Sequence, residues 1–425
     1  MDSHGDGSLT PSGYMPRVVD SLVSASLEAN PIVVVEGAKG CGKTWTGMHH
    51  AQSQVLLADT PGARMQAETL PRRVLEGPRP RLVDEWAMVP SIWDTAKHVV
   101  DEGRDNGCFI LTGSSRPADD ITRHSGAGRV GRVRMRPMSL VESGESTGEI
   151  SLGSQFDGDP CDAGEPAVSI PDLTESLCRG GWPRNLGRST FAAQEHLDGY
   201  LDEMARVEVP GNGTRHDPRR VHRLLTSLAR NVSTPASLST LATDVAGEPP
   251  LSWPTTASYM DELERLFLVE DLPAWVTRTR SKAKLRKAPK RHFVDPSLAV
   301  SLLGADPDRL LDDLETMGLL FESLVIRDLR VYAAANRAEV YHYKNSYEHE
   351  LDAVVERRDG RWIAIEVKLG LSQVEEAADS LAQACRSIDA GKRGSPAKKL
   401  VITGHGYSYE RDDGVSVVPI TALGP

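Results

Sequence analysis

The chain has 425 residues, 39% apolar and 26% charged, and its formal net charge at pH 7 is −11. This length exceeds one hydrophobic core of ordinary size, so we expect about two to four domains. The acidic balance argues against a protein whose whole surface binds nucleic acid. No apolar run approaches the roughly 20 residues that cross a bilayer, so we expect no membrane partner.

Cysteine usage and the N-terminal sequence bear on the compartment. The five cysteines are scattered and include no CxxC pair, which argues against both a disulfide framework and a zinc site. The first residues, "MDSHGDGSLTPSGYMPRVVD", show no basic stretch followed by an apolar one, so nothing marks the chain for export. We therefore expect a cytoplasmic protein.

A phosphate-binding loop is predicted between a buried strand and a helix in "PIVVVEGAKGCGKTWTG". Glycines let successive backbone N–H groups surround phosphate oxygens, and the helix N-terminus adds its positive end. In the pattern GxxxxGK[ST], the lysine reaches the β and γ phosphates and the hydroxyl ligates Mg²⁺. The cofactors expected are thus ATP and Mg²⁺, and the nucleotide-binding residues are Gly37, Ala38, Lys39, Gly40, Cys41, Gly42, Lys43 and Thr44.

An acidic pair, Asp84 and Glu85, ends the next apolar strand in "RPRLVDEWAMVP". Beside a phosphate-binding loop, strand-end carboxylates are where Mg²⁺ chemistry occurs. Asp84 is expected to hold the metal through water, and Glu85 to polarise the attacking water. The alternative is that the pair only ends a strand and opens the next helix. The upstream loop favours the Mg²⁺ interpretation.

Two features downstream are candidates for sensing the γ-phosphate. The strand "CFILTGSSR" ends in hydroxyls, among which Ser114 is the candidate sensor, although ordinary turn chemistry explains them equally well. Arginines in the segment that follows are the second feature, and among them we single out Arg129 as the phosphate-sensing candidate. The alternative is that these arginines lie in a solvated basic loop. The arginines considered are Arg123, Arg129 and Arg132.

These motifs, with "AGRV", "RMRPMSL" and "LCRGGWPRN", resemble AAA-superfamily ATPases of bacteria and archaea that carry a C-terminal restriction-endonuclease-like domain of unknown function. The resemblance implies a P-loop NTPase domain with an AAA-type parallel sheet in residues 1–142 and a helical lid or connector in 171–216. Residues 143–170, rich in glycine, serine and acids, are expected to form a flexible insertion. AAA-type enzymes often complete a site with a neighbour's arginine, which makes a homo-oligomer a candidate assembly.

Residues 217–292 predict a winged helix-turn-helix. "DPRRVHRLLTSLARNV" has apolar residues at the i, i+3, i+4 and i+7 positions of a core-facing helix, and a short helix, a longer helix and an extended hairpin follow. The longest basic run, Arg278 to Arg291, lies in that hairpin and is expected to contact DNA phosphates. The third helix is acidic and fits base reading poorly. The alternative is that the helices act only as a lid or spacer.

Residues 293–425 predict a PD-(D/E)xK nuclease-like α/β domain. A helix, "GLLFESLVIRDLRVYAAAN", precedes the strands "EVYHYKN", "LDAVVER" and "WIAIEVKLG", a second helix and a further strand "KKLVITG". The order α-β-β-β-α-β is that of the nuclease core, in which one acid on the second strand and an E-x-K on the third meet at a divalent metal.

The polar residues of these strands fit such a metal site. Period-two geometry places Glu366 and Lys368 on one face, and a buried strand rarely keeps both without reason. The resemblance implies that Asp352 and Glu366 ligate the metal, that Lys368 orients water, and that Glu322 supplies the acid of the first helix. The alternative is a structural ion pair of Glu366 and Lys368 with Asp352.

The sequence thus predicts a Mg²⁺-dependent ATPase, associated with DNA, that carries a nuclease-like C-terminal domain. A second hypothesis is a nucleotide-dependent switch that binds a partner protein or DNA through a catalytically inactive C-terminal scaffold. A phosphate-binding kinase is a third, weakened by the lack of a recognisable site for a second substrate.

Overall fold

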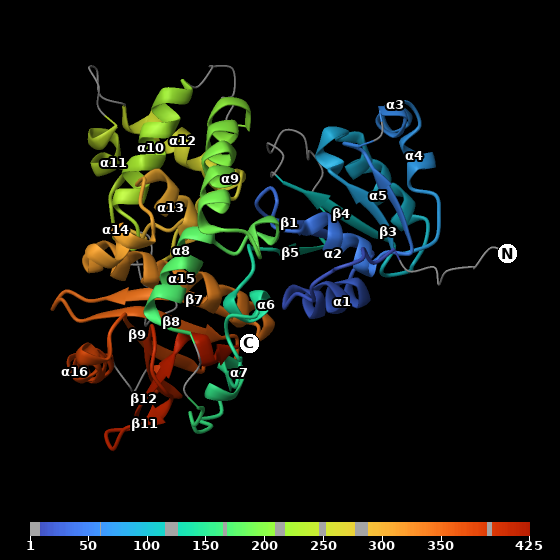
Figure 1. The fold of residues 1–425 in the computed structure, drawn as a ribbon. Helices are drawn as coiled ribbons and strands as arrows, with labels where there is room; N and C mark the ends of the chain where they lie inside the picture. The colour runs from blue at the N-terminus through green and yellow to red at the C-terminus, as the bar shows by residue number, and fades with distance from the viewer. Residues whose placement is uncertain are drawn as a thin grey trace. The chain divides into compact units, whose positions relative to one another are not determined.

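The protein is described by a computed structural model in which two compact units are distinguished (Figure 1). The described residues are 9–59, 61–114, 126–164, 168–208, 217–245, 252–276, 288–388 and 393–425. The first unit comprises Met1–Pro137 with Arg265–Phe267, and the second comprises Met138–Glu264 with Leu268–Pro425. Within the described ranges, no helix is long and apolar enough to cross a membrane.

The N-terminal unit is built around one parallel sheet, as predicted for this domain, and its five strands follow the order β2-β3-β4-β1-β5. Strand β4 therefore lies between β1 and β3, so the C-terminal ends of all three meet at one edge. The elements are α1 Val19–Ala29, β1 Ile32–Glu36, α2 Lys43–His50, β2 Ser53–Leu56, α3 Pro61–Thr69, α4 Pro71–Val74, β3 Arg81–Asp84, α5 Ser91–Asp101, β4 Phe109–Gly113 and β5 Val130–Arg134.

Both faces of this sheet are buried, which explains why its strands read as continuous apolar runs instead of alternating ones. All five residues of β1 and of β4 are buried. On one face Ile32 and Val34 pack with Trp86 and Trp93, whose rings stack 5.1 Å apart. The opposite face holds a second core that includes residues of α1. Apolar packing on both faces thus holds the sheet in place, and the phosphate-binding loop lies at the C-terminal edge of that sheet.

The second unit begins with helices and one short strand. Helix α10 buries the apolar stripe expected from its sequence. The elements are α6 Leu140–Ser143, β6 Ile150–Ser151, α7 Leu152–Gln155, α8 Ile170–Arg179, α9 Thr190–Glu203, a π-helix Met204–Glu208, α10 Pro218–Arg230, α11 Leu238–Asp244, α12 Trp253–Arg265, α13 Pro296–Leu302 and α14 Pro307–Asp312.

The three helices α10, α11 and α12 are followed by two antiparallel bridges, Val269 to Phe293 and Leu272 to Lys290. This is the order expected of a winged helix, and that assignment stays a prediction. Most of the basic run, residues 277–287, lies outside the described residues.

The segment predicted as a flexible insertion has defined structure over residues 143–164. Strand β6 pairs in parallel with the short strand β13, Leu423–Gly424. The Ser146 hydroxyl donates to the Leu423 carbonyl at 2.7 Å, and the Thr147 N–H donates to the Thr421 carbonyl at 2.8 Å. Backbone pairing with a distant strand therefore orders a stretch whose composition alone indicates flexibility.

The C-terminal part of the second unit, drawn in orange and red in Figure 1, is a six-stranded sheet in the order β11-β12-β10-β9-β8-β7. Strand β9 pairs antiparallel with β8 and parallel with β10. The predicted order of helices and strands is present, and β11 and β12 extend the sheet beyond it. The elements are α15 Leu314–Ala335, β7 Ala338–Lys344, β8 Glu350–Arg357, β9 Trp362–Lys368, α16 Val374–Ser387, β10 Lys398–Thr403, β11 Tyr409–Glu410 and β12 Val415–Pro419.

Candidate nucleotide site and acidic cluster

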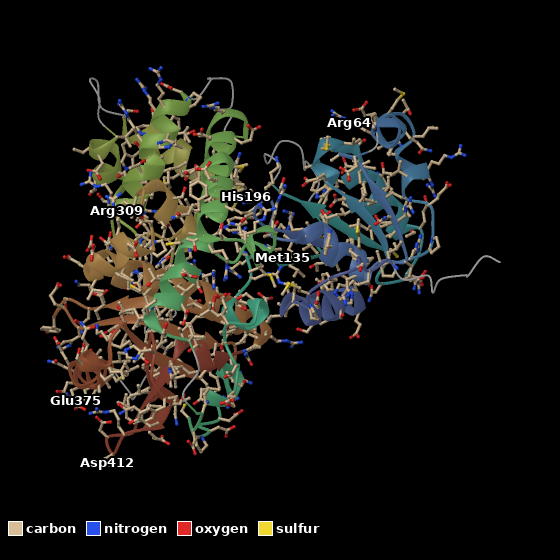
Figure 2. All side chains as sticks on the ribbon, viewed as in Figure 1. Arg64, Met135, His196, Arg309, Glu375 and Asp412 are labelled. Carbon is tan, nitrogen blue, oxygen red and sulfur yellow. The ribbon has the colours of Figure 1, made fainter. Side chains whose placement is uncertain are left out.

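The loop between β1 and α2 requires glycine at three positions. Gly40 and Gly42 have φ of 81° and 109°, a left-handed backbone that side chains disfavour. At Gly37, an added Cβ would lie 2.0 Å from the carbonyl oxygen of Met135, which is labelled in Figure 2. The glycines of the motif are thus required by the conformation and packing of the loop, as well as by the close approach of its N–H groups to an anion.

The first two residues of α2 face the end of the sheet. The ammonium of Lys43 is buried and donates to the Ala38 carbonyl at 2.8 Å, so it lies over the loop. The Thr44 hydroxyl donates to Oδ1 of Asp84 at 2.8 Å. Residues from two predicted motifs are therefore in direct contact.

Asp84 also accepts a hydrogen bond from a residue of β4. The Thr112 hydroxyl donates to the same Oδ1 at 2.5 Å, because β4 lies between β1 and β3. Two hydroxyls and one buried carboxylate form an oxygen-rich set of the kind that Mg²⁺ prefers. Thr112 was among the hydroxyls at this strand end, but Ser114 was the residue singled out.

Glu85 follows Asp84 with a left-handed backbone, φ 53° and ψ 44°. Its Oε2 accepts long hydrogen bonds from the Ser114 hydroxyl at 3.3 Å and the Ser114 N–H at 3.4 Å. Burial raises the pKa of the Glu85 carboxyl; the ammonium of Lys43 opposes this effect and the charge of Asp84 adds to it. A carboxyl of raised pKa beside a lysine and a strand-end aspartate suits proton transfer.

The arginine candidates are not gathered at this edge. Arg129 precedes β5 and forms an exposed ion pair with Asp101, its Nη2 lying 3.0 Å from Oδ2. Because β1 and β5 are parallel, this position is at the opposite end of the sheet from the phosphate-binding loop. Arg132 instead lies 3.1 Å from Oε2 of Glu36, at the end of β1. Arg123 falls outside the described residues.

Sequence reasoning missed Arg17, which supports the loop from before α1. Its buried guanidinium donates to the Cys41 carbonyl at 2.9 Å and to the Arg136 carbonyl at 2.8 Å. A lone arginine ahead of a helix carries no recognisable motif, so only the fold reveals this role. Nearby, Asp20 lies 3.2 Å from Nε2 of His50, which joins α1 to the end of α2.

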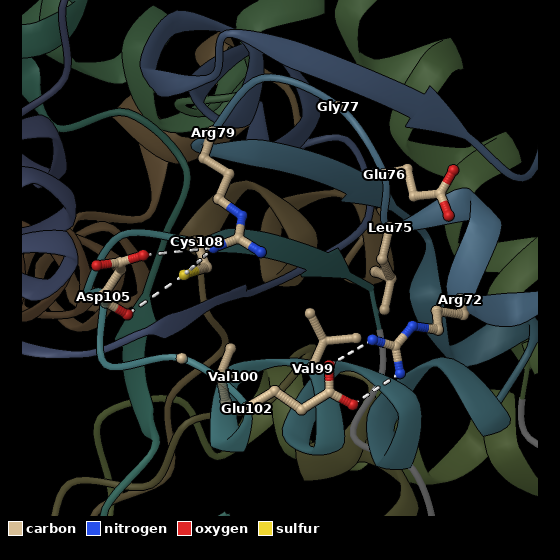
Figure 3. Close-up of a pocket in the computed structure, with 11 residues that line it drawn as sticks. Arg72, Leu75, Glu76, Gly77, Arg79, Val99, Val100, Glu102, Asp105 and Cys108 are labelled. Atoms are coloured by element: carbon tan, nitrogen blue, oxygen red, sulfur yellow. Dashed lines mark hydrogen bonds and ion pairs between the residues drawn. The ribbon is translucent and has the colours of Figure 1, made fainter.

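A cavity of about 440 Å³ lies elsewhere in the unit, next to Cys108 at the start of β4 (Figure 3). The phosphate-binding loop follows the C-terminal end of β1, whereas Cys108 precedes the N-terminal end of β4. Because β1 and β4 are parallel, the cavity lies at the edge of the sheet opposite the loop. Its arginines face acids: Arg72 bonds Glu102, and Arg79 lies 3.9 Å from Asp105. The motif residues and this cavity are therefore separate features.

In the second unit, the predicted acids Glu322 and Asp352 lie around one lysine, together with Glu350, which was not predicted. The ammonium of Lys290 lies 2.9 Å from Oε1 of Glu322, 2.9 Å from Oε1 of Glu350 and 3.3 Å from Oδ1 of Asp352. Burial disfavours the charged amine, but the three carboxylates outweigh it and raise the pKa of Lys290. We refer to Glu322, Glu350, Asp352 and Glu366 as the acidic cluster.

Asp352 and Glu366 come from neighbouring strands, as the prediction required. Oδ2 of Asp352 accepts from the Val367 N–H at 2.9 Å, and Oε1 of Glu366 accepts from the Ser380 hydroxyl at 3.1 Å. Burial, followed by the charge of Asp352 and a hydrogen bond to it, raises the pKa of Glu366 well above its usual value. Lys368 is partly exposed at the end of the same strand.

Two members of the basic run differ from expectation. Lys290 and Arg291 were predicted to contact phosphates from a hairpin surface, yet both are buried. Arg291 donates to the Ala236 carbonyl at 3.0 Å and pairs with Asp271. Both charges are therefore buried with ion-pair partners and do not lie on a solvated surface.

Comparison with known families divides the chain in three. Residues 29–143 match a family described as an AAA domain, 170–309 match a domain of unknown function (DUF8612), and 317–423 match a domain of unknown function (DUF4143). The N-terminal unit thus has the fold of a P-loop, ATPase-type domain. No curated protein matches the chain.

Solved structures that match this chain have low identity to it and low TM-scores. The Walker-type ATPase PABY2304 of Pyrococcus abyssi is 14% identical over 70% of this chain and 98% of its own, with a TM-score of 0.43. AMPPCP-bound DnaA from Aquifex aeolicus is 15% identical over 60% and 89%, with a TM-score of 0.28. The RuvB Holliday junction branch migration motor of Thermotoga maritima is 15% identical over 62% and 93%, with a TM-score of 0.28.

Proposed function

We propose that this chain is a Mg²⁺-dependent ATP-binding and ATP-hydrolysing protein. The observation that carries the proposal is the convergence of Thr44 and Thr112 on one oxygen of Asp84, next to the buried ammonium of Lys43. Hydroxyl and carboxylate oxygens fit Mg²⁺, and a buried lysine over a glycine loop fits a triphosphate. When bound, Mg²⁺ neutralises charge on the β and γ phosphates.

Each residue has a distinct role in this proposal. The N–H groups of the loop and the first turn of α2 bind phosphate oxygens, and Lys43 neutralises the β and γ phosphates. Thr44 and Asp84 would hold the Mg²⁺ ion. Glu85 accepts a proton from the attacking water, for which its raised pKa is suited. Ser114, whose hydroxyl donates to Glu85, positions that carboxylate.

The direct test is phosphate release from ATP with and without Mg²⁺. Glu85→Gln is expected to lower turnover by about 10²-fold or more while nucleotide binding persists, since general-base contributions are typically of this order. Glu28→Gln, an exposed carboxyl of the same unit, is the control and should be unaffected. Turnover that survives Glu85→Gln, or needs no divalent ion, would contradict the proposal.

We further propose that the protein is DNA-associated and that residues 293–425 have a nuclease-like fold. The first point is supported by the basic residues of 278–287, and the second by the helix and strand order and by the meeting of Asp352 with Glu366. DNA binding through phosphates weakens steeply with salt. An affinity for duplex DNA that is insensitive to salt, or unchanged when the lysines and arginines of 278–287 are replaced, would oppose this role.

The second candidate is a nucleotide-dependent switch whose C-terminal part is a catalytically inactive scaffold. The ammonium of Lys290 amid the carboxylates favours it, because a cation of the chain itself already compensates their charge. Incubation of plasmid DNA with Mn²⁺ and ATP separates the two candidates. Cleavage by the wild type that Glu366→Ala abolishes supports the nuclease, and intact DNA in both supports the scaffold.

A further inference from the structure

Lys290 is placed by the fold. It forms an antiparallel bridge with Leu272, donating its N–H to the Leu272 carbonyl at 3.0 Å and accepting from the Leu272 N–H at 2.9 Å. The next residue is held as well, since the Arg291 N–H donates to the Thr234 carbonyl at 2.9 Å. The side chain therefore projects into the acidic cluster from a backbone that is hydrogen-bonded on both edges.

Each hydrogen of the Lys290 ammonium has a carboxyl partner. Its three hydrogens match three carboxyl groups within 3.3 Å, which come from α15 and from β8, and the side chain is only 5% exposed. A divalent ion in the same place would need oxygens at about 2.0–2.6 Å. Two cations cannot share this space, so the residues as arranged do not fit a metal.

Buried carboxylates that face one another need a compensating positive charge. We propose that the ammonium of Lys290 takes the place of a divalent metal ion among Glu322, Glu350 and Asp352, so that this part of the chain carries a permanent internal cation. The proposal deepens the scaffold candidate and rests on it. It implies that the acidic cluster binds no Mg²⁺ or Mn²⁺ in the wild type, and that removing the amine converts it into a divalent-cation site.

The experiment measures Mn²⁺ binding to the full chain without nucleotide, by the loss of the free Mn²⁺ signal in electron paramagnetic resonance. Lys290→Met keeps an unbranched apolar side chain and removes the charge. It is expected to gain a Mn²⁺ site at least about tenfold tighter than any in the wild type, because three acidic side chains lose the cation that lies between them. Adding Asp352→Asn to this variant should abolish the gained site.

A matched control is Lys344→Met. Lys344 also lies near Glu350, at 3.6 Å, but its side chain is 39% exposed, so its loss should create no Mn²⁺ site. Thermal unfolding with and without Mn²⁺ gives a second measurement, in which only Lys290→Met should be stabilised by the ion. Folded Lys290→Met that gains no Mn²⁺ site would overturn the proposal.

The wild type decides the question even if Lys290→Met does not fold. A Mn²⁺ site in the wild type that Asp352→Asn removes would overturn the proposal, and wild-type binding that is unchanged by Asp352→Asn supports it. These outcomes are independent of the ATPase, whose failure would appear as absent phosphate release. They are also distinct from failure of the scaffold candidate, which would appear as DNA cleavage.

Discussion

The hydroxyl of Thr44 donates a 2.8 Å hydrogen bond to Oδ1 of Asp84, which joins the first turn of α2 to the end of β3. The same oxygen accepts from Thr112 of β4. Three chain segments thus converge on one buried carboxylate, and the contact is already made by the protein's own residues. Replacing Thr44, Asp84 or Thr112 should therefore lower both the free energy of unfolding and the rate of nucleotide turnover.

Thr112→Val tests this convergence. Valine keeps the shape but removes one of two donors to a buried carboxylate, so we expect a loss of about 1–3 kcal/mol in the free energy of unfolding, with slower ATP hydrolysis. Urea unfolding followed by fluorescence measures the first effect. Thr69→Val, whose hydroxyl is exposed and bonds only its own helix, is the control. Equal losses in the two variants would contradict the assignment.

Gly37→Ala should disrupt the loop. The added Cβ would lie 2.0 Å from the Met135 carbonyl oxygen, a distance that forces the backbone to move. We expect destabilisation of several kcal/mol and loss of ATP binding, in line with strain in a tightly packed site. Gly62→Ala in α3 has open space around it and should be neutral or stabilising by up to about 1 kcal/mol. Thermal unfolding of both variants provides the comparison.

Lys43→Ala removes the buried ammonium over the loop. Charged hydrogen bonds contribute about 1.5–3 kcal/mol, so ATP affinity is expected to fall by about 10- to 100-fold. Calorimetric titration with ATP and Mg²⁺ measures the change, and Arg64→Ala on the exposed face of α3 serves as the control. A Lys43→Ala protein that holds nucleotide as tightly as the wild type would remove the basis for the nucleotide site.

The acidic cluster predicts a pH dependence of stability. Burial, and then the charge of Asp352, raises the pKa of Glu322 to about 8 from an ordinary value of 4.5, and the ammonium of Lys290 only partly opposes this. Between these values the folded state holds a proton that the unfolded state has lost, so stability falls as pH rises through this range and levels off above about pH 8. This contribution changes by at most about 1.4 kcal/mol per pH unit.

Glu322→Gln isolates that contribution, since glutamine does not titrate. The difference in unfolding free energy between wild type and variant, measured in urea at pH 6, 7 and 8, should shift in favour of the variant as pH rises. A difference that stays constant across this range would show that Glu322 is already ionised at pH 6.

The sequence was sufficient to predict a feature where the residue type itself determines the backbone conformation. The glycines around Lys43 predict a loop because few other residues adopt its backbone, and buried strands on both sides fix where it lies. The contact of Thr44 with Asp84 follows from the same logic, whereas the parallel sheet and the neighbouring positions of Asp352 and Glu366 were implied by the family resemblance. Period-two alternation by itself placed only Glu366 and Lys368 on one face of a single strand.

Where the prediction fell short, a distant partner determines the outcome. Residues 143–164 look flexible by composition, but β6 pairs with β13, far away in the sequence. Lys290 looks like one charge of a basic run, and only the fold reveals three carboxylates around it. Arg129 was singled out as the phosphate-sensing candidate, but β5 begins at the edge of the sheet away from the loop. Such pairings depend on tertiary contacts that no local pattern encodes.

The left-handed backbone of Glu85 has a consequence for how this site can change. A side chain in that conformation costs roughly 1–2 kcal/mol, whereas glycine adopts it freely. Glycine at this position should therefore stabilise the folded state, and a screen for thermostability should select Glu85→Gly. Selection for turnover would remove the same variant, so the two screens should drive residue 85 in opposite directions.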